Sequence, residues 1–339
     1  MKKKFLALLL AGVMALSLAA CGGDTGDTTG DTTDETAGAD TAGETYTVGI
    51  VQQEQHVALD QATQGFQDAL TELLGDSVTF DHQNASGDLS GCTTITGSFV
   101  SQGVDLIMAN GTTALQAAMA STETIPILGT SITEYGVALG LEDLDPTVGT
   151  GTNISGTSDL APLDQQAAMI QEWFPDASSV ALLYCSSEPN SQYQVDTVEE
   201  YLVGMGYACT QYSFSDSNDL SAVATTACAE NDVLYIPTDN TAAKNAELIG
   251  NIALDAGVPV IAGEEGICRG CGVATLTISY YDIGYATGEM AYEILVNGAD
   301  VSAMPIEYAP QFTPKYNPVM CEELGLTPPD GYEAIEMDA

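Results

Sequence analysis

Positive charge is nearly absent from this chain. Six Lys and Arg residues face 48 Asp and Glu residues, which gives a formal net charge of −42 at pH 7. Half of the basic residues are Lys2, Lys3 and Lys4, so only Lys244, Arg269 and Lys315 remain in the rest of the sequence. Such a negative field repels nucleic acid and anionic lipid headgroups. We therefore expect neither as a partner and interpret the charge as an adaptation for solubility.

Sequence signatures of catalysis are also missing. No Gly-x-x-x-x-Gly-Lys-[Ser/Thr] phosphate loop occurs, which argues against an ATPase, and no Gly-x-Ser-x-Gly elbow indicates a serine hydrolase. The two histidines, His56 and His82, are far apart in sequence and lack a metal-binding helix pattern. We expect no enzymatic activity, no cofactor and no metal.

Cysteines do not form the pattern of a disulfide-stapled scaffold. Besides Cys21 there are seven, scattered along the chain and odd in number. We expect most of them to be small buried hydrophobic residues. Cys268-Arg-Gly-Cys271 has the spacing of a redox pair but not the thioredoxin-like context, so a structural role is favoured over a local disulfide or a weak metal site.

The first 45 residues predict export and anchoring. Lys2–Lys4 precede an apolar run that is too short for a stable membrane span and ends in Leu-Ala-Ala-Cys21. We interpret residues 1–20 as a signal peptide and Cys21 as the lipidated residue; an ordinary signal peptide with a chance cysteine is the alternative. Residues 21–45 contain almost only Gly, Asp, Thr, Ala and Glu, which predicts a disordered acidic tether.

Short apolar strands alternate with amphipathic helices from Tyr46 onward. The strands are rich in Val, Ile and Leu without strict alternation, which indicates parallel sheets buried on both faces. The pattern runs twice, first to Leu128 and again from Leu163 to Val296. It predicts an α/β protein of two doubly wound parallel-sheet lobes. One helix is expected over residues 242–256.

The boundaries of the two lobes follow from this duplication. We expect the N-terminal lobe to comprise residues 46–154 plus 277–300, and the C-terminal lobe 155–276 plus 301–339. The hinge is expected at Thr152–Ser158, with later crossings near Thr275–Tyr280 and Asp300–Pro305.

Polar residues follow the strands at equivalent positions in both halves. Because ligands of open parallel sheets bind beyond the carboxyl ends of the strands, these loops predict a polar cleft between the lobes. Each residue alone is also explained as a helix cap. The candidate ligand-binding residues are Gln53, His56, Thr112, Thr113, Ser131, Glu188, Asn190, Ser191, Asp239, Asn240, Glu264 and Tyr280.

Several of these stretches resemble one known family. They include Gly49-Ile-Val-Gln52, Asn153-Ile-Ser-Gly-Thr-Ser-Asp159, Thr238-Asp239-Asn240 and Gly263-Glu264-Glu265-Gly266. In order and spacing they are similar to the ABC-importer substrate-binding proteins related to the tryptophan/tyrosine-binding proteins. The resemblance implies a type I periplasmic-binding-protein fold with a three-strand hinge. It also implies closure around one amino acid, often aromatic, and delivery to an ABC permease and ATPase.

The residues can support such a ligand. With few basic side chains available, Thr112, Thr113, Ser131 and Ser191 would hold its carboxylate through hydroxyl and backbone N–H groups. Asp239 or Glu264 would pair with its ammonium. Tyr280, Tyr281 or Tyr135 would provide an aromatic wall. Arg269 would either clasp the carboxylate or neutralise Glu264 and Glu265.

The expected protein is therefore a monomeric receptor at the outer face of a bacterial membrane, attached through its lipid alone. A ligand-sensing lipoprotein with the same fold, or a receptor for a different small solute, is the alternative. The sequence does not separate these readings.

Overall fold

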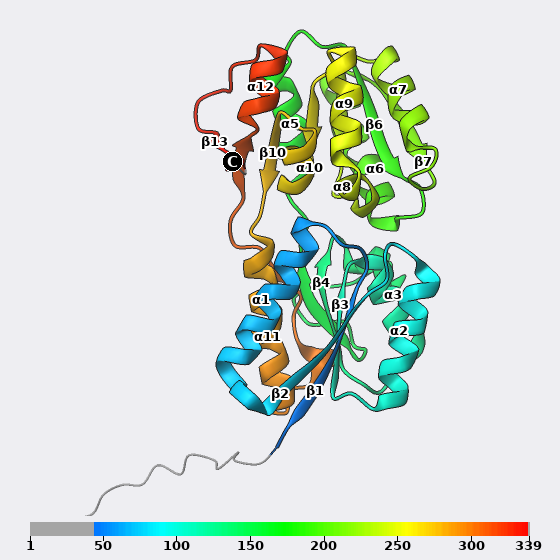
Figure 1. Ribbon diagram of the computed structural model, residues 1–339, viewed down its shortest axis with the longest axis vertical. Coiled ribbons are helices and arrows are strands. Elements are labelled where there is room, and N and C mark those ends of the chain that lie inside the picture. The colour runs from blue at the N-terminus through cyan, green and yellow to red at the C-terminus, as the bar shows by residue number, and fades with distance from the viewer. Residues whose placement is uncertain (1–43, 338–339) are drawn as a thin grey trace, which may run out of the picture. The chain divides into compact units, whose positions relative to one another are not determined.

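The computed structural model describes residues 44–337, which form two α/β lobes (Figure 1). The signal peptide, Cys21 and nearly all of the tether expected from the sequence lie outside the described residues. Among the residues that are described, no helix is long and apolar enough to cross a membrane.

The first lobe is a six-stranded sheet in the order β11-β5-β4-β3-β1-β2. Every neighbouring pair of strands is parallel. Its strands are β1 (Tyr46–Gln52), β2 (Val78–Asn84), β3 (Leu106–Asn110), β4 (Ile127–Ile132), β5 (Ile154–Ser158) and β11 (Glu307–Tyr308). Its helices are α1 (Val57–Leu74), α2 (Leu89–Gln102), α3 (Thr112–Ser121), α4 (Tyr135–Leu139) and α11 (Tyr280–Leu295), with 3₁₀ turns at Gly75–Ser77 and Val301–Ala303.

The second lobe is a seven-stranded sheet in the order β13-β12-β10-β9-β8-β6-β7. Only β12 runs antiparallel to its neighbour β10 among these pairs of described strands. Its strands are β6 (Ser179–Cys185), β7 (Ala208–Phe214), β8 (Val233–Ile236), β9 (Val260–Ala262), β10 (Ala274–Thr277), β12 (Thr313–Tyr316) and β13 (Glu333–Ala334). Its helices are α5 (Leu163–Trp173), α6 (Pro189–Met205), α7 (Leu220–Glu230), α8 (Asn240–Lys244), α9 (Ala246–Ala256), α10 (Glu265–Gly270) and α12 (Pro318–Leu324).

The central strands have the burial that their composition predicts. Every residue of β3, β4, β8 and β10 is buried. Helices on both faces cover the apolar side chains, and each fully buried Val, Leu or Ile contributes about 1.5–3 kcal/mol to folding. The α/β class and the two parallel-sheet lobes are therefore confirmed.

Helices α1 and α11 pack side by side although they are distant in sequence (Figure 1). Gly284 of α11 lies against the carbonyl oxygen of Ala62 in α1, where a Cβ atom would clash with that oxygen. Gly65 of α1 meets the backbone of Tyr281 in the same way. This contact fixes the start of α11, and with it Tyr280, against the first lobe.

The lobe boundaries differ from those expected. The expected division after residue 154 falls inside β5, which pairs with β4 and so belongs to the first sheet. β11 also pairs in the first sheet, although residues 301–339 were expected in the C-terminal lobe. Both short strands complete the edge of the first sheet, a role that a run such as Ile-Ser-Gly-Thr-Ser does not reveal.

The chain passes between the sheets at three places. It crosses after Ser158, again between Thr277 and Tyr280, and a third time between Tyr308 and Thr313. The second crossing lies within the expected range Thr275–Tyr280, whereas the first follows the expected hinge, because Ile154–Ser158 is strand β5 of the first sheet. The prediction of the third crossing near Asp300–Pro305 was wrong, because these residues form a turn that leads into β11 of the first sheet.

The single helix expected over residues 242–256 is instead two helices. α8 ends at Lys244, and Asn245 has φ −111° and ψ 17°, outside regular helix geometry, before α9 begins at Ala246. The break places Lys244 at the end of a one-turn helix that faces the other lobe.

Candidate ligand-binding site

The two hinge segments meet through a buried carboxylate. Asp159 follows β5 at the first crossing, is 4% exposed, and accepts a 2.9 Å hydrogen bond at Oδ2 from the Tyr280 hydroxyl. Tyr280 begins α11 at the second crossing. Burial raises the pKa of Asp159, and the Tyr280 and Thr133 hydroxyls partly offset this rise. Asp159 was not among the candidate residues, although it ends a stretch that carried the family resemblance.

Four polar atoms near this junction are buried without a hydrogen-bond partner at standard geometry among residues 44–337. Three are acceptors or can act as acceptors: Asp159 Oδ1, Asn190 Oδ1 and His56 Nδ1. The fourth is the Ser131 hydroxyl. Native proteins leave few buried polar groups unpaired, so such a group marks a site that something else completes.

Contacts between these residues place them at one junction. The Asp159 backbone N–H donates to the carbonyl of Ile132, next to Ser131. Asn190 Nδ2 donates to the carbonyl of Thr238, whose side chain interacts with the Tyr280 hydroxyl. The site therefore draws on the ends of β4 and β5 in one lobe and on β8 and α6 in the other.

Ser131 has an unusual backbone for its residue type. Its φ is +56°, in the left-handed region that non-glycine residues seldom occupy. Strain of this kind collects at functional sites because the surrounding structure must hold it in place. Ser131 was expected to contact ligand, and its hydroxyl is buried without a hydrogen-bond partner among the described residues.

His56 connects the lobes directly. Its Nε2 hydrogen-bonds to Asn240 Oδ1 at 3.0 Å, which leaves Nδ1 as the unpaired ring nitrogen. Asn240 is held in turn by Glu188, whose Oε2 accepts hydrogen bonds from the backbone and side-chain nitrogens of Asn240. The other oxygen of Glu188 accepts from the backbone and hydroxyl of Thr241. Glu188 therefore orients α8 and has its oxygens committed.

Asp239 and Glu264, the expected ammonium partners, are both engaged elsewhere. Asp239 caps α8 through Ala242 N–H and also accepts from Cys185 N–H at 2.7 Å. Glu264 caps α10 through the N–H groups of Gly266 and Ile267. Burial raises the pKa of both carboxyls, and the charge of Glu188 adds to the rise at Asp239. Helix capping accounts for the positions of both.

Some of the remaining candidates are held by hydrogen bonds within the chain, and others are buried beside the strand ends. Gln53 Oε1 accepts the N–H of Thr113, so the start of α3 is already capped by this chain. Thr112 and Ser191 are buried beside the same strand ends. Tyr135 is fixed by hydrogen bonds to Gly129 and Thr157, and Tyr281 is exposed on α11 and bonded to Asp68. Neither forms an aromatic wall, which leaves Tyr280.

Arg269 and the cysteines have local roles. Arg269 lies 3.4 Å from Glu265 at i,i+4 spacing, in agreement with the neutralising alternative. All seven cysteines of the described chain are free, and all but Cys209 are buried. Cys268 lies on α10 and Cys271 in the turn that follows it. Burial raises the pKa of both thiols, which disfavours the reactive thiolate.

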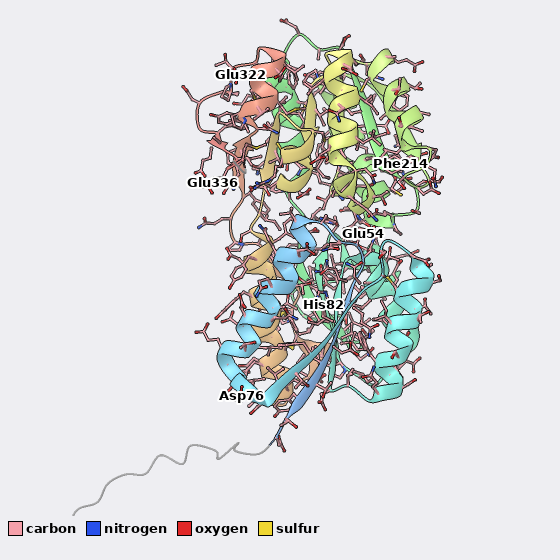
Figure 2. All side chains as sticks on the ribbon, viewed as in Figure 1. Glu54, Asp76, His82, Phe214, Glu322 and Glu336 are labelled. Carbon is pink, nitrogen blue, oxygen red and sulfur yellow. The ribbon has the colours of Figure 1, made fainter. Side chains whose placement is uncertain are left out.

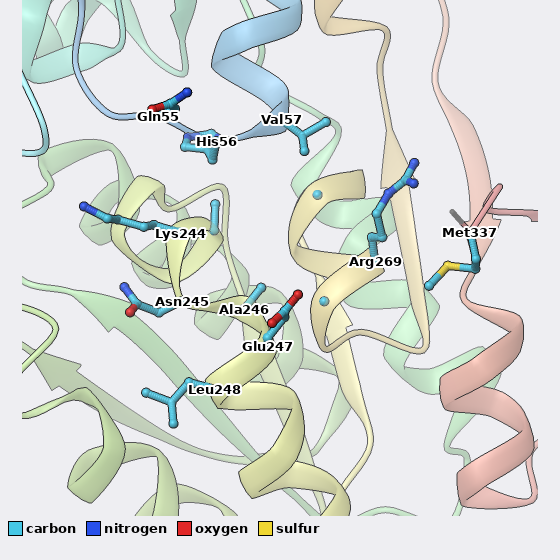
Figure 3. Close-up of a pocket in the computed structure, with 13 residues that line it drawn as sticks. Gln55, His56, Val57, Lys244, Asn245, Ala246, Glu247, Leu248, Arg269 and Met337 are labelled. Atoms are coloured by element: carbon cyan, nitrogen blue, oxygen red, sulfur yellow. The ribbon is translucent and has the colours of Figure 1, made fainter. Parts of the chain in front are cut away.

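A cavity of about 670 Å³ lies at one end of the junction between the lobes. Its lining includes Gln55 and His56 from the first lobe and Lys244, Asn245 and Arg269 from the second (Figure 3). His56 lines this cavity and also lies within electrostatic range of the hinge carboxylate Asp159.

The family model described as ABC transporter substrate binding protein matches residues 47–334. The chain belongs to this family. Substrate-binding proteins of ABC systems are extracellular or periplasmic and bind solutes without transforming them.

Individual relatives of this substrate-binding protein agree with the match. It is 33% identical over 311 residues to the tyrosine-binding protein of Clostridioides difficile strain R20291, covering 90% of this chain and 87% of the relative. A Streptococcus pneumoniae ABC domain in complex with L-Trp superimposes with a TM-score of 0.82 at 27% identity, covering 86% of this chain and all of that one. A leucine-binding protein of Thermotoga maritima, at 14% identity and a TM-score of 0.58, shows the type I fold alone.

The arrangement of the lobes resembles that of the ligand-bound relative. The ligand-free, open structure of an adhesive substrate-binding protein from Clostridium difficile is 34% identical and covers 86% of this chain, yet its TM-score is only 0.66. The tryptophan complex, although less similar in sequence than the open structure, therefore superimposes better on this chain. The higher TM-score with the ligand-bound relative and the hydrogen bond between His56 and Asn240 together indicate a closed arrangement of the two lobes.

Proposed function

We propose that this protein is the lipid-anchored, extracellular receptor of an ABC importer and that it closes around an aromatic α-amino acid. The observation that best supports this proposal is that the hinge carboxylate of Asp159 is buried and one of its oxygens has no hydrogen-bond partner among the described residues. Relatives described as tyrosine-binding and as a tryptophan complex support the ligand class.

The chemistry of the unpaired atoms fits an ammonium group. An ammonium has three N–H donors and no acceptor. Asp159 Oδ1, Asn190 Oδ1 and His56 Nδ1, in the tautomer that carries its proton on Nε2, would supply three acceptors from three segments of both lobes. Because the group on Asp159 is a carboxylate, its bond would be charge-assisted and stronger than a neutral one.

The other end of an amino acid would use hydroxyl donors. Ser131 would donate to the ligand carboxylate, with Thr112 at the neighbouring strand end as a second donor. No Lys or Arg is needed for this arrangement. The Tyr280 ring, fixed through its hydroxyl to Asp159, is the aromatic surface nearest to the proposed ammonium site.

Ligand class is tested by thermal unfolding of the purified protein against amino acids, sugars, short peptides and nucleosides, after unfolding and refolding to remove co-purified ligand. At one hundred times its Kd, a ligand adds about 2.7 kcal/mol to the free energy of unfolding. Stabilisation by L-tyrosine, L-tryptophan or L-phenylalanine alone is expected. Stabilisation by a sugar or nucleoside alone would discard the ligand class.

The role of Asp159 is tested by Asp159→Asn. Loss of the charge should cost about 2–5 kcal/mol of binding, at least about thirtyfold in Kd. Asp164→Asn, on an exposed position of the first turn of α5, is the matched control and should bind as the wild type. Equal affinities for Asp159→Asn and the wild type would place the ammonium elsewhere.

Anchoring and delivery are separate parts of the proposal. Cys21→Ser should release the protein from cells into the medium and abolish incorporation of labelled fatty acid. Deletion of the protein should reduce uptake of the labelled amino acid. Unchanged retention on the cell, or unchanged uptake, would reject the corresponding part.

A further inference from the structure

Charge is divided unequally between the two lobes. Residues 44–158 and 280–308, which form the first lobe, contain no Lys or Arg. The second lobe carries Lys244, Arg269 and Lys315. Both lobes are nevertheless strongly acidic, so bringing them together works against electrostatic repulsion.

Lys244 reaches across the junction between the lobes. Its Nζ lies 2.9 Å from Glu54 Oε2, and the two side chains are 46% and 7% exposed. Glu54 is on the loop that follows β1, and Figure 2 labels it where the first lobe meets the second. Lys244 ends α8, beside the loop that carries Gln55 and His56 (Figure 3).

The loop around Glu54 is held for this contact. Gln52 Nε2 donates to the Glu54 carbonyl, and Glu54 Oε1 accepts the N–H of Gln55. Glu54 Oε2 is thereby left to Lys244. Two residues later His56 bonds to Asn240, so α8 meets this loop at both of its ends.

The other two cations make contacts inside the second lobe. Lys315 Nζ lies 2.7 Å from Glu265 Oε2, and Arg269 lies 3.4 Å from the other oxygen of Glu265. Lys315 therefore provides a natural comparison for Lys244. Each is a lysine within 3 Å of a carboxylate, but only the Lys244 pair joins residues of different lobes.

We propose that Lys244 and Glu54 form an electrostatic latch that positions the loop after β1 against α8 and offsets the repulsion between the lobes on closure. The latch forms when the lobes close and is lost when they separate. Ligand affinity then depends on Lys244 although Lys244 need not touch the ligand. This dependence weakens as salt screens the repulsion, with a Debye length of about 10 Å at 0.1 M and about 3 Å at 1 M.

The test compares Lys244→Gln with Lys315→Gln, which change the net charge equally. At low salt, Lys244→Gln should weaken L-tyrosine binding about tenfold. This loss lies between the contribution of an exposed salt bridge and the cost of breaking a buried one. At 1 M NaCl the loss should fall below about threefold. Lys315→Gln should change Kd less than twofold at either salt concentration. Equal losses in the two variants, or a loss independent of salt, would overturn the latch.

A measurement without ligand separates the latch from the proposed ligand class. Small-angle X-ray scattering of the ligand-free protein at low salt should show a larger radius of gyration for Lys244→Gln than for the wild type and Lys315→Gln. If wild-type protein binds no aromatic amino acid but this difference is present, the ligand proposal fails and the latch stands. If all three proteins scatter alike at low salt, the latch is wrong.

Discussion

Tyr280 donates a 2.9 Å hydrogen bond from its hydroxyl to Asp159, and these two residues stand on different crossings of the chain between the lobes. The pair links the carboxylate proposed to bind ligand to the segments that must move during closure. Pairing of Asp159 with the proposed ligand ammonium would therefore act directly at the hinge.

Tyr280→Phe should shift the pH dependence of ligand binding. The Tyr280 hydroxyl lowers the pKa of Asp159 against the larger effect of burial, so its removal raises that pKa further. Because binding needs the ionised carboxylate, affinity falls as pH falls through the pKa of Asp159. Calorimetric titrations with L-tyrosine between pH 4 and 8 should show this fall beginning at higher pH in the variant.

The control for Tyr280 is Tyr285→Phe, which removes a hydroxyl bonded to Glu72 on the exposed side of α11. It should leave the pH profile unchanged. Identical profiles for Tyr280→Phe and wild type would separate Tyr280 from the charge of Asp159.

Ser131→Ala should weaken ligand binding without loss of stability. The Ser131 hydroxyl is buried and has no hydrogen-bond partner among the described residues, so its removal takes away no internal hydrogen bond. Loss of one ligand bond of about 1 kcal/mol predicts a roughly fivefold higher Kd. Melting temperature and Kd should be measured together.

Ser155→Ala is the comparison for Ser131. The Ser155 hydroxyl donates to the carbonyl of Met304 at 2.9 Å inside the first lobe. This variant should lose about 1 kcal/mol of stability and keep its affinity. A destabilised Ser131→Ala with normal affinity would make Ser131 a structural residue.

Stability should be greater near pH 5 than near pH 8. Asp159, Asp239 and Glu264 have pKa values raised chiefly by burial. A carboxyl with a raised folded-state pKa binds more protons in the folded than in the unfolded chain, so stability falls as pH rises from the unfolded value, near 4, through the folded one.

Other carboxyls set the acid limit of this stability. Backbone and side-chain hydrogen bonds from Ser178 and Ser179 lower the pKa of Asp232 to about 2. Groups of this kind stabilise the fold above their unfolded pKa and lose that effect as pH falls through the folded value. Melting temperatures from pH 2 to 9 should therefore pass through a maximum on the acidic side of neutrality. A melting temperature that rises steadily up to pH 8 would contradict the raised pKa values of Asp159, Asp239 and Glu264.

Gly284→Ala should destabilise the first lobe. A Cβ there would overlap the carbonyl of Ala62, which cannot move without shifting α1. Overpacking of this kind costs about 1–3 kcal/mol, and a clash with backbone favours the upper end. Gly97→Ala in α2 has open space around the new methyl group and should stabilise by about 0.5–1 kcal/mol. Denaturant unfolding of both variants checks the contrast, and a neutral Gly284→Ala would reject the close approach of the two helices.

The sequence alone determined the fold class and most of its elements. Continuous apolar runs such as Leu106–Ala109 require burial on both faces, and the helices between such runs are what make neighbouring strands parallel. Local composition also indicated polar residues at the carboxyl ends of the strands: Asn110 and Ser131 lie in the last residues of β3 and β4, and Thr238 follows β8. These features depend on neighbours in the chain and can be read from it.

Only the tertiary structure decided which of those polar residues already have hydrogen-bond partners within the chain. Asp239 and Glu264 looked suited to an ammonium, but each meets the N–H groups of its own helix start. Asp159 was not among the candidate residues, and its partner Tyr280 lies 121 residues away. Lys244 and Glu54 are 190 residues apart. Whether a polar group keeps an unpaired atom depends on contacts between distant segments, and those contacts exist only once both lobes have folded and met.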